Sequence, residues 1–177
     1  MTKISRVFVA GTMQGATDGI AIVDQSYRAT IASIVAAVVP GAECFDPSVE
    51  VTQRLSDPET IELIGAVVQS GRSALAMAAL PQPLADLRVT FQRMTAQAAR
   101  CDLCVAFLPG ATPSMGTAME MYAAFCGQVP IVTITAMRTN LAIVSVSTWM
   151  LSDLEAFERW LRLYVSGQKM ERKCESL

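Results

Sequence analysis

Short runs of β-branched and aromatic residues alternate along the chain with longer segments in which apolar residues recur every three or four positions. The short runs predict β-strands at 6–11, 42–46, 103–108, 130–135 and 141–147. Runs such as VFVA and IVTI lack polar alternation, which is typical of strands buried on both faces. The pattern predicts an α/β fold: a doubly wound, flavodoxin-like, five-stranded parallel sheet in the order 2-1-3-4-5, with helices on both faces.

The longer segments predict helices at 24–38, 58–78, 84–100, 115–127 and 153–166. Residues 47–102 exceed what one crossover helix needs, so they are expected to form two helices joined at the LPQP segment. Ser152 and Glu155 predict a capping box at the start of the last helix. The small and apolar residues of 64–80 are interpreted either as ordinary core or as a surface for a second copy of the chain.

Composition limits the class of protein. A length of 177 residues predicts a single domain, 1–167, followed by a polar tail at 168–177. The formal net charge of -2 gives no basic field for a nucleic-acid polymer. No apolar run approaches the roughly 20 residues that span a bilayer, and the N-terminal run is too short for a signal peptide. We therefore expect a cytoplasmic protein without a membrane partner.

The five cysteines are odd in number and widely spread, which favours reduced thiols over a disulfide framework. Cys101 and Cys104 form a CxxC, for which a redox or metal role is the alternative to small apolar residues between a helix and a strand. The chain contains no histidine, so a catalyst here must use carboxylates, hydroxyls or thiols. We expect neither a metal nor a cofactor.

Three loops follow the carboxyl ends of the strands, where parallel sheets bind ligands. The first is GTMQGATDG after the first strand, whose glycines and Thr12 suit a phosphate or a sugar hydroxyl. A plain glycine turn is the alternative for this loop. The second is DPSVE, which begins at Asp46, and the third is PGATPSMGTAME.

Glu120 is the acidic residue of the third loop and the helix that follows it. The apolar stripe of that helix is interpreted as Met115, Met119, Tyr122 and Cys126, which leaves Glu120 on another face. Gly116, one turn earlier on that face, would leave a hollow above the carboxylate, and Ser114 is a plausible N-cap. The helix dipole favours an ionised Glu120, acting as a nucleophile or an electrostatic stabiliser, and a solvated surface position is the alternative.

These segments resemble the nucleoside 2-deoxyribosyltransferase family, including its hydrolytic relatives, the deoxynucleoside 5′-monophosphate N-glycosidases. The stretches VFVAGTMQGA, AARCDLCVAFLPG and PSMGTAMEMYAAFCGQVPIVTI carry the resemblance in order along most of the chain. It implies that Glu120 attacks the anomeric carbon and displaces the base, because an anion suits an oxocarbenium-like transition state. It also implies substrate contacts from the following residues: Gly11, Thr12, Met13, Gln14, Gly15, Ser114 and Gly116.

Two departures from the family pattern stand out. The position of the family's acid for the leaving base is Met94 here, and Asp86 or Asp46 is considered as a substitute. Gln14 stands where the nucleotide hydrolases tend to have arginine, whereas Ser114 resembles that hydrolase branch. In the segment MRTN, the resemblance implies a substrate contact from Asn140, and a turn between strands is the alternative.

The leading hypothesis is therefore an N-glycosidase or deoxyribosyltransferase that acts on a nucleoside or a nucleoside 5′-monophosphate, as a homodimer or higher homo-oligomer. A non-catalytic nucleotide-binding module on the same scaffold is the alternative, because loss of the acid would leave the pocket intact. A flavodoxin-like receiver is disfavoured, since no acidic cluster follows the first strand.

Overall fold

The computed structural model describes residues 3–14, 21–71 and 73–168. A parallel sheet has the order β2-β1-β3-β4-β5, as the sequence predicts. The strands are β1 (Arg6–Gly11), β2 (Glu43–Phe45), β3 (Leu103–Leu108), β4 (Ile131–Thr135) and β5 (Trp149–Leu151). In the register, β1 lies between β2 and β3, with Phe8 opposite both Phe45 and Cys104.

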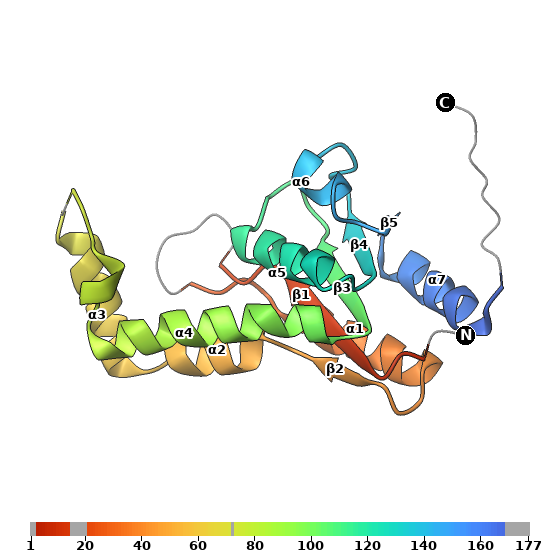
Figure 1. Ribbon diagram of the computed structural model, residues 1–177, viewed down its shortest axis with the longest axis horizontal. Helices are drawn as coiled ribbons and strands as arrows, with labels where there is room; N and C mark the ends of the chain where they lie inside the picture. The colour runs from red at the N-terminus through yellow and green to blue at the C-terminus, as the bar shows by residue number, and fades with distance from the viewer. Residues whose placement is uncertain (1–2, 15–20, 72, 169–177) are drawn as a thin grey trace.

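Helices cover both faces of this sheet (Figure 1). On one face, α1 (Ser26–Val38) and α7 (Leu154–Ser166) pack on the side chains of Val7, Val9 and their neighbours in β3 and β4. On the other face, α5 (Met115–Cys126) and α6 (Leu141–Val144) pack on Phe8 and Ala10. Each strand supplies both faces, because successive side chains point to opposite sides.

The crossover between β2 and β3 contains three α-helices instead of the two that the sequence predicts. They are α2 (Ser48–Leu55), α3 (Pro58–Gln69) and α4 (Gln82–Ala96). The short helix η1 (Met77–Ala79) lies between α3 and α4, and the short helix η2 (Gln97–Arg100) follows α4. Asp57 caps α3 by accepting a hydrogen bond from the Thr60 backbone N–H, and Pro58 occupies the first turn, as expected. In Figure 1, α4 lies beside α5 and runs outward past the sheet with α2 and α3.

The fifth strand lies later than predicted. Residues 141–147 begin with helix α6, and the strand is Trp149–Leu151. The side chain of Asn140 accepts hydrogen bonds from the backbone N–H groups of Ala142 and Ile143, which starts a helix. A short apolar run does not distinguish a buried strand from a buried helix turn, so this cap decides the conformation.

The last helix, α7, buries one face, with Phe157, Trp160 and Leu161 fully enclosed. Its N-cap is Asp153, which accepts a hydrogen bond from the Ala156 backbone N–H at 2.7 Å. The predicted capping box from Ser152 is therefore wrong by one position. Within the described ranges, no helix is long and apolar enough to cross a membrane.

Candidate active site

Glu120 lies on the face of α5 that packs against the sheet. The helix begins after Ser114, whose hydroxyl accepts hydrogen bonds from the Thr117 backbone N–H at 3.3 Å and the Thr117 hydroxyl at 2.9 Å. The buried positions of α5 are Thr117, Glu120, Met121 and Ala124, which share one helical face. Glu120 is only 4% exposed, so the structure excludes a solvated surface position for it.

The apolar stripe that the sequence indicates on α5 is exposed. Met115, Met119 and Tyr122 are 78%, 50% and 61% exposed, and Cys126 is exposed as well. The helix is apolar on both sides, so periodicity alone gives the spacing but not the direction. Directly after α5, Gly127 packs closely on η2, where an added Cβ would stand 2.7 Å from Ala99 Cα.

Burial raises the pKa of the Glu120 carboxyl group from 4.5 to about 8, chiefly through lost hydration. The positive charge of Arg28 and a hydrogen bond from the Gly11 backbone N–H oppose this rise, and the charge of Asp46 adds to it. The folded protein therefore disfavours the ionised form of Glu120, which corrects the expectation that the helix dipole favours it. The helix dipole acts mainly on the first turn, and Glu120 lies in the second.

A cavity of about 260 Å³ opens beside Glu120 at the carboxyl end of β1. Among the described residues, Oε2 of Glu120 is buried without a hydrogen-bond partner. The cavity brings together six of the residues that the sequence singles out: Gly11, Met13, Gln14, Ser114, Gly116 and Glu120. Its remaining wall is apolar and comes from α2, α4 and α5: Val51, Leu55, Phe91, Met115 and Met119.

Gly116 contributes to the size of this cavity. A Cβ at this position would stand 3.4 Å from Cζ of Phe91, in contact with the ring that forms the opposite wall. The hollow that the sequence predicts above Glu120 is therefore bordered by Gly116, which has no side chain, and by the Phe91 ring of α4.

Thr12 and Asn140 line neighbouring hollows rather than this cavity. Thr12 borders a separate hollow of about 220 Å³ between α1 and the end of β3, together with Tyr27. Asn140 borders a small hollow of about 90 Å³ that also touches Ser114, and its side-chain oxygen is used to cap α6. These contacts agree with the alternative interpretation of Asn140, a turn between strands β4 and β5. Gly15 lies outside the described residues.

Neither candidate for the acid beside Glu120 lines the cavity. Asp86 accepts a hydrogen bond from Gln82 at 2.7 Å and borders a surface hollow near the start of α3. Its placement corrects the expectation of a catalytic role, because the N-terminal part of α4 runs outward past the sheet (Figure 1). Met94 is 6% exposed and packs in an apolar cluster with Val51 and Leu55.

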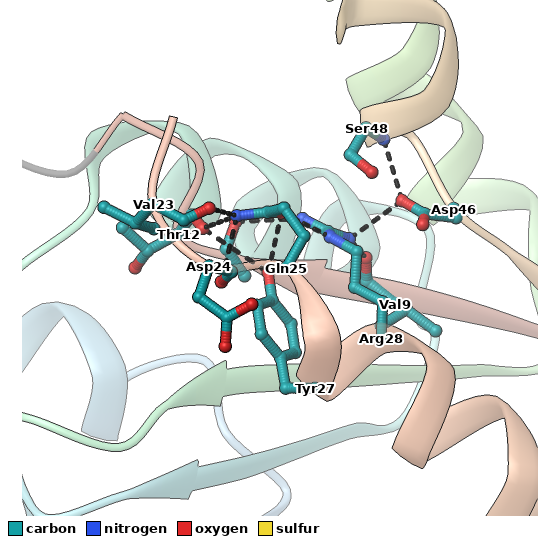
Figure 2. A network of polar contacts seen from close by, with 10 residues as sticks. Val9, Thr12, Val23, Asp24, Gln25, Tyr27, Arg28, Asp46 and Ser48 are labelled. Carbon is teal, nitrogen blue, oxygen red and sulfur yellow. Dashed lines mark hydrogen bonds and ion pairs between the residues drawn. The ribbon is translucent and has the colours of Figure 1, made fainter. Parts of the chain in front are cut away.

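Asp46 forms an ion pair with the buried Arg28 rather than a wall of the cavity. One of its carboxylate oxygens lies 3.0 Å from Arg28 Nη1 and accepts a hydrogen bond from the Ser48 backbone N–H at 2.8 Å. Figure 2 shows this pair beside the end of β1. The charge of Asp46 thus acts on Glu120, although Asp46 does not line the cavity.

Comparisons with known proteins identify the fold. No family model matches the chain, and no curated protein matches it. Among solved structures, a 2-deoxyribosyltransferase from Bacillus psychrosaccharolyticus aligns with a TM-score of 0.53 and 14% identity, over 87% of this chain and 90% of that one. A conserved protein from Enterococcus faecalis V583 aligns with a TM-score of 0.55 and 15% identity, over 91% and 99%. The chain has the fold of these proteins.

A CMP N-glycosidase from Clostridium botulinum also aligns, with 19% identity and a TM-score of 0.44, over 90% of this chain and all of that one. The doubly wound, five-stranded parallel sheet predicted from the sequence is confirmed by the strand order and by the two alignments above. No cluster of three or more potential metal ligands occurs within the ranges that the structure describes.

Sequence reasoning missed Arg28 and Tyr27. Both are buried on α1, on the same face as Ile31 and Val35. The signal was available, since a charged residue within the apolar stripe of a helix is rarely buried without a partner. The partner is Asp46, which the sequence had singled out for a different reason.

Proposed function

We propose that the chain is an N-glycosidase or deoxyribosyltransferase that cleaves the N-glycosidic bond of a nucleoside or nucleoside 5′-monophosphate, with Glu120 as the nucleophile. One observation carries the proposal: the buried carboxyl group of Glu120 borders a cavity of about 260 Å³, beside Gly11 at the end of β1. The fold shared with a 2-deoxyribosyltransferase supports the same reaction class.

The proposed reaction proceeds in two steps. An oxygen of the ionised Glu120 attacks the anomeric carbon, the C–N bond breaks, and its electron pair leaves with the base, which takes a proton from solvent. Water or a second base then attacks the glycosyl ester and releases Glu120. A carboxylate suits both steps, because it stabilises the oxocarbenium-like transition state and then captures it.

The lining of the cavity favours a neutral nucleoside over a 5′-monophosphate. Among the described residues, no lysine or arginine lines it, and the polar side chains are those of Gln14, Ser114 and Glu120. A phosphate dianion gains most from charge-assisted hydrogen bonds, which this lining does not supply. The apolar surfaces of Leu55, Phe91 and Met119 suit a flat base.

A non-catalytic nucleoside-binding module is the second candidate. It is favoured by the lack of a second acidic side chain in the lining, within the described residues, and by the raised pKa of Glu120, which disfavours the ionised nucleophile. Such a module would keep the cavity and lose the acceleration of base departure.

We also propose that the protein forms a homo-oligomer through the outer face of α5. Met115, Met119, Tyr122 and Phe125 are all at least half exposed on this helix. Tyr122 and Phe125 stack with their ring centroids 6.2 Å apart, which gives a continuous apolar surface for a second copy.

Release of free base distinguishes the two candidate functions. The protein is incubated with a panel of nucleosides and 5′-monophosphates, and free base is measured by chromatography. We expect release from nucleosides by the wild type, and a loss on the order of 10³-fold or more in Glu120→Gln and Glu120→Ala. Nucleoside binding without any release would favour the module, and equal release by wild type and Glu120→Gln would reject Glu120 as nucleophile.

A further inference from the structure

The guanidinium group of Arg28 is enclosed at the end of β1, and its side chain is only 5% exposed. It donates hydrogen bonds to the carbonyl oxygens of Val9 at 2.6 Å and Gly11 at 3.2 Å. These carbonyls lie past the last residue of β1 that pairs with β2, which is Phe8. Arg28 therefore binds the backbone of β1 in the segment where the neighbouring strand has ended.

Two further side chains fix the orientation of Arg28, as Figure 2 shows. Its Nε donates to Oε1 of Gln25 at 2.7 Å, and Nη1 pairs with Asp46 at 3.0 Å. The amide nitrogen of Gln25 in turn donates to the carbonyl oxygens of Thr12 at 2.9 Å and Val23 at 2.8 Å. The network thus holds the two ends of the loop between β1 and α1 against one arginine.

Gly11 connects this network with the candidate nucleophile. Its carbonyl oxygen accepts from Arg28, while its backbone N–H donates to the carboxyl group of Glu120. The charge of Arg28 favours ionisation of Glu120, and the charge of Asp46 opposes it. One buried cation therefore interacts with two carboxyl groups, those of Asp46 and Glu120.

We propose that Arg28 is a positioning residue for Glu120: it fixes the turn that hydrogen-bonds the carboxyl group, and it supplies the positive charge that Glu120 shares with Asp46. This inference rests on the proposed function, because it assigns Arg28 the task of keeping the nucleophile ionisable inside an apolar cavity. Without this charge, a fully desolvated carboxyl group stays protonated and does not attack.

The other groups around Glu120 do not replace this charge. Within the described residues, the other titratable groups that interact electrostatically with Glu120 are Tyr27 of α1 and Cys104 of β3. Burial raises the pKa values of both groups and keeps them neutral. The helices α4 and η2 pack against α5, but their arginines are exposed: Arg88, Arg93 and Arg100. The acidic residue of α4, Asp86, binds Gln82 instead.

Titration of Glu120 itself tests the proposal without relying on activity. The full-length protein is labelled with ¹³C-glutamate, and the carboxyl resonance of Glu120 is assigned as the one missing from Glu120→Gln. We expect the midpoint of the wild type near pH 8. Asp46→Asn is expected to lower it, and Arg28→Gln to raise it, each by about one pH unit. Arg28→Lys keeps the charge and is expected to stay closer to the wild type than Arg28→Gln.

Arg162→Gln is the matched control, because Arg162 is an exposed arginine of α7 that pairs with Glu158. It removes the same charge from the protein and is expected to leave the midpoint unchanged. Midpoints that do not move in Arg28→Gln and Asp46→Asn, or that move in the same direction, would overturn the proposal. If circular dichroism shows that Arg28→Gln is unfolded, Asp46→Asn decides alone: a lower midpoint supports the proposal, and an unchanged or higher one rejects it.

The pH dependence of base release separates this inference from the proposed function. If the enzyme is active, the rising limb of kcat/KM against pH is expected to follow the titration midpoint in each variant. Midpoints that shift as expected in a protein that releases no base would leave the role of Arg28 standing and reject the glycosidase. Base release with an unchanged midpoint in every variant would support the glycosidase and reject the role of Arg28.

Discussion

The phenol ring of Tyr27 lies directly over Gly11, so that a Cβ at Gly11 would stand 2.2 Å from the Tyr27 hydroxyl oxygen. The ring cannot move away freely, because it stacks on Phe107 with ring centroids 4.7 Å apart. A glycine at the end of β1 is therefore needed for packing against α1.

Gly11→Ala is expected to lower the free energy of unfolding by about 1 to 3 kcal/mol, as overpacking of an enclosed site does. Denaturant titration measures this change. Gly65→Ala is the matched control, because Gly65 lies inside α3 and has nothing within 4 Å of an added Cβ. The control is expected to gain up to about 1 kcal/mol from helix propensity. Equal stability of the two variants would contradict the packing role of Tyr27.

The buried Glu120 makes folding stability depend on pH. Its pKa is raised in the folded protein to about 8 from 4.5, so its contribution is complete below pH 4.5 and is lost as pH rises to about 8. Glu120→Gln lacks this titration and keeps the shape of the side chain. We expect the Tm of the wild type relative to Glu120→Gln to fall steadily between these two pH values. A constant difference would show that Glu120 titrates normally.

Gly116→Ala separates stability from activity. The added methyl group would meet the Phe91 ring at 3.4 Å, an ordinary contact, and alanine favours a helix over glycine by up to about 1 kcal/mol. Thermal unfolding should therefore show equal or higher stability. The narrower cavity is expected to reduce kcat/KM for base release about tenfold or more through misplacement of the sugar. A fully active variant would place the substrate elsewhere.

The outer face of α5 predicts an effect on oligomeric state. Tyr122→Glu places a charge in the exposed apolar surface and is expected to shift a dimeric or larger wild type toward the monomer, as measured by light scattering. Val68→Glu is the comparison, since Val68 is 65% exposed on α3, in the segment 64–80 that the sequence also offers as an interface. Dissociation by Val68→Glu alone would assign the interface to α3.

Much of the fold follows from pattern alone, and the exceptions have local causes. The strands β1, β3 and β4 are continuous apolar runs, so their identity and order could be predicted. Helix α2 spans only 8 residues, which are too few turns for the spacing of its apolar residues to identify a helix. Residues 141–147 are equally apolar as a strand or as a helix turn, and only the contacts of Asn140 separate the two.

The candidate site was predictable where backbone geometry fixes it. Ser114, Gly116 and Glu120 follow from the cap and the spacing of one helix, and Gly11 from the end of a strand. The pKa of Glu120 was not predictable, because it depends on which side of α5 faces the sheet. The pairing of Arg28 with Asp46 joins segments that are distant in sequence, and no local pattern encodes it.

The outward extension formed by α2, α3 and α4 separates two tasks within one cavity. The groups that would act on the sugar belong to β1 and α5, whereas Val51, Leu55 and Phe91 come from the extension. Under the proposed function, substitutions in α2 or α4 would alter the shape offered to the base and would leave Glu120 and Gly11 in place. A scaffold divided in this way can acquire new substrates through changes in one segment, while the proposed catalytic residue on α5 stays unchanged.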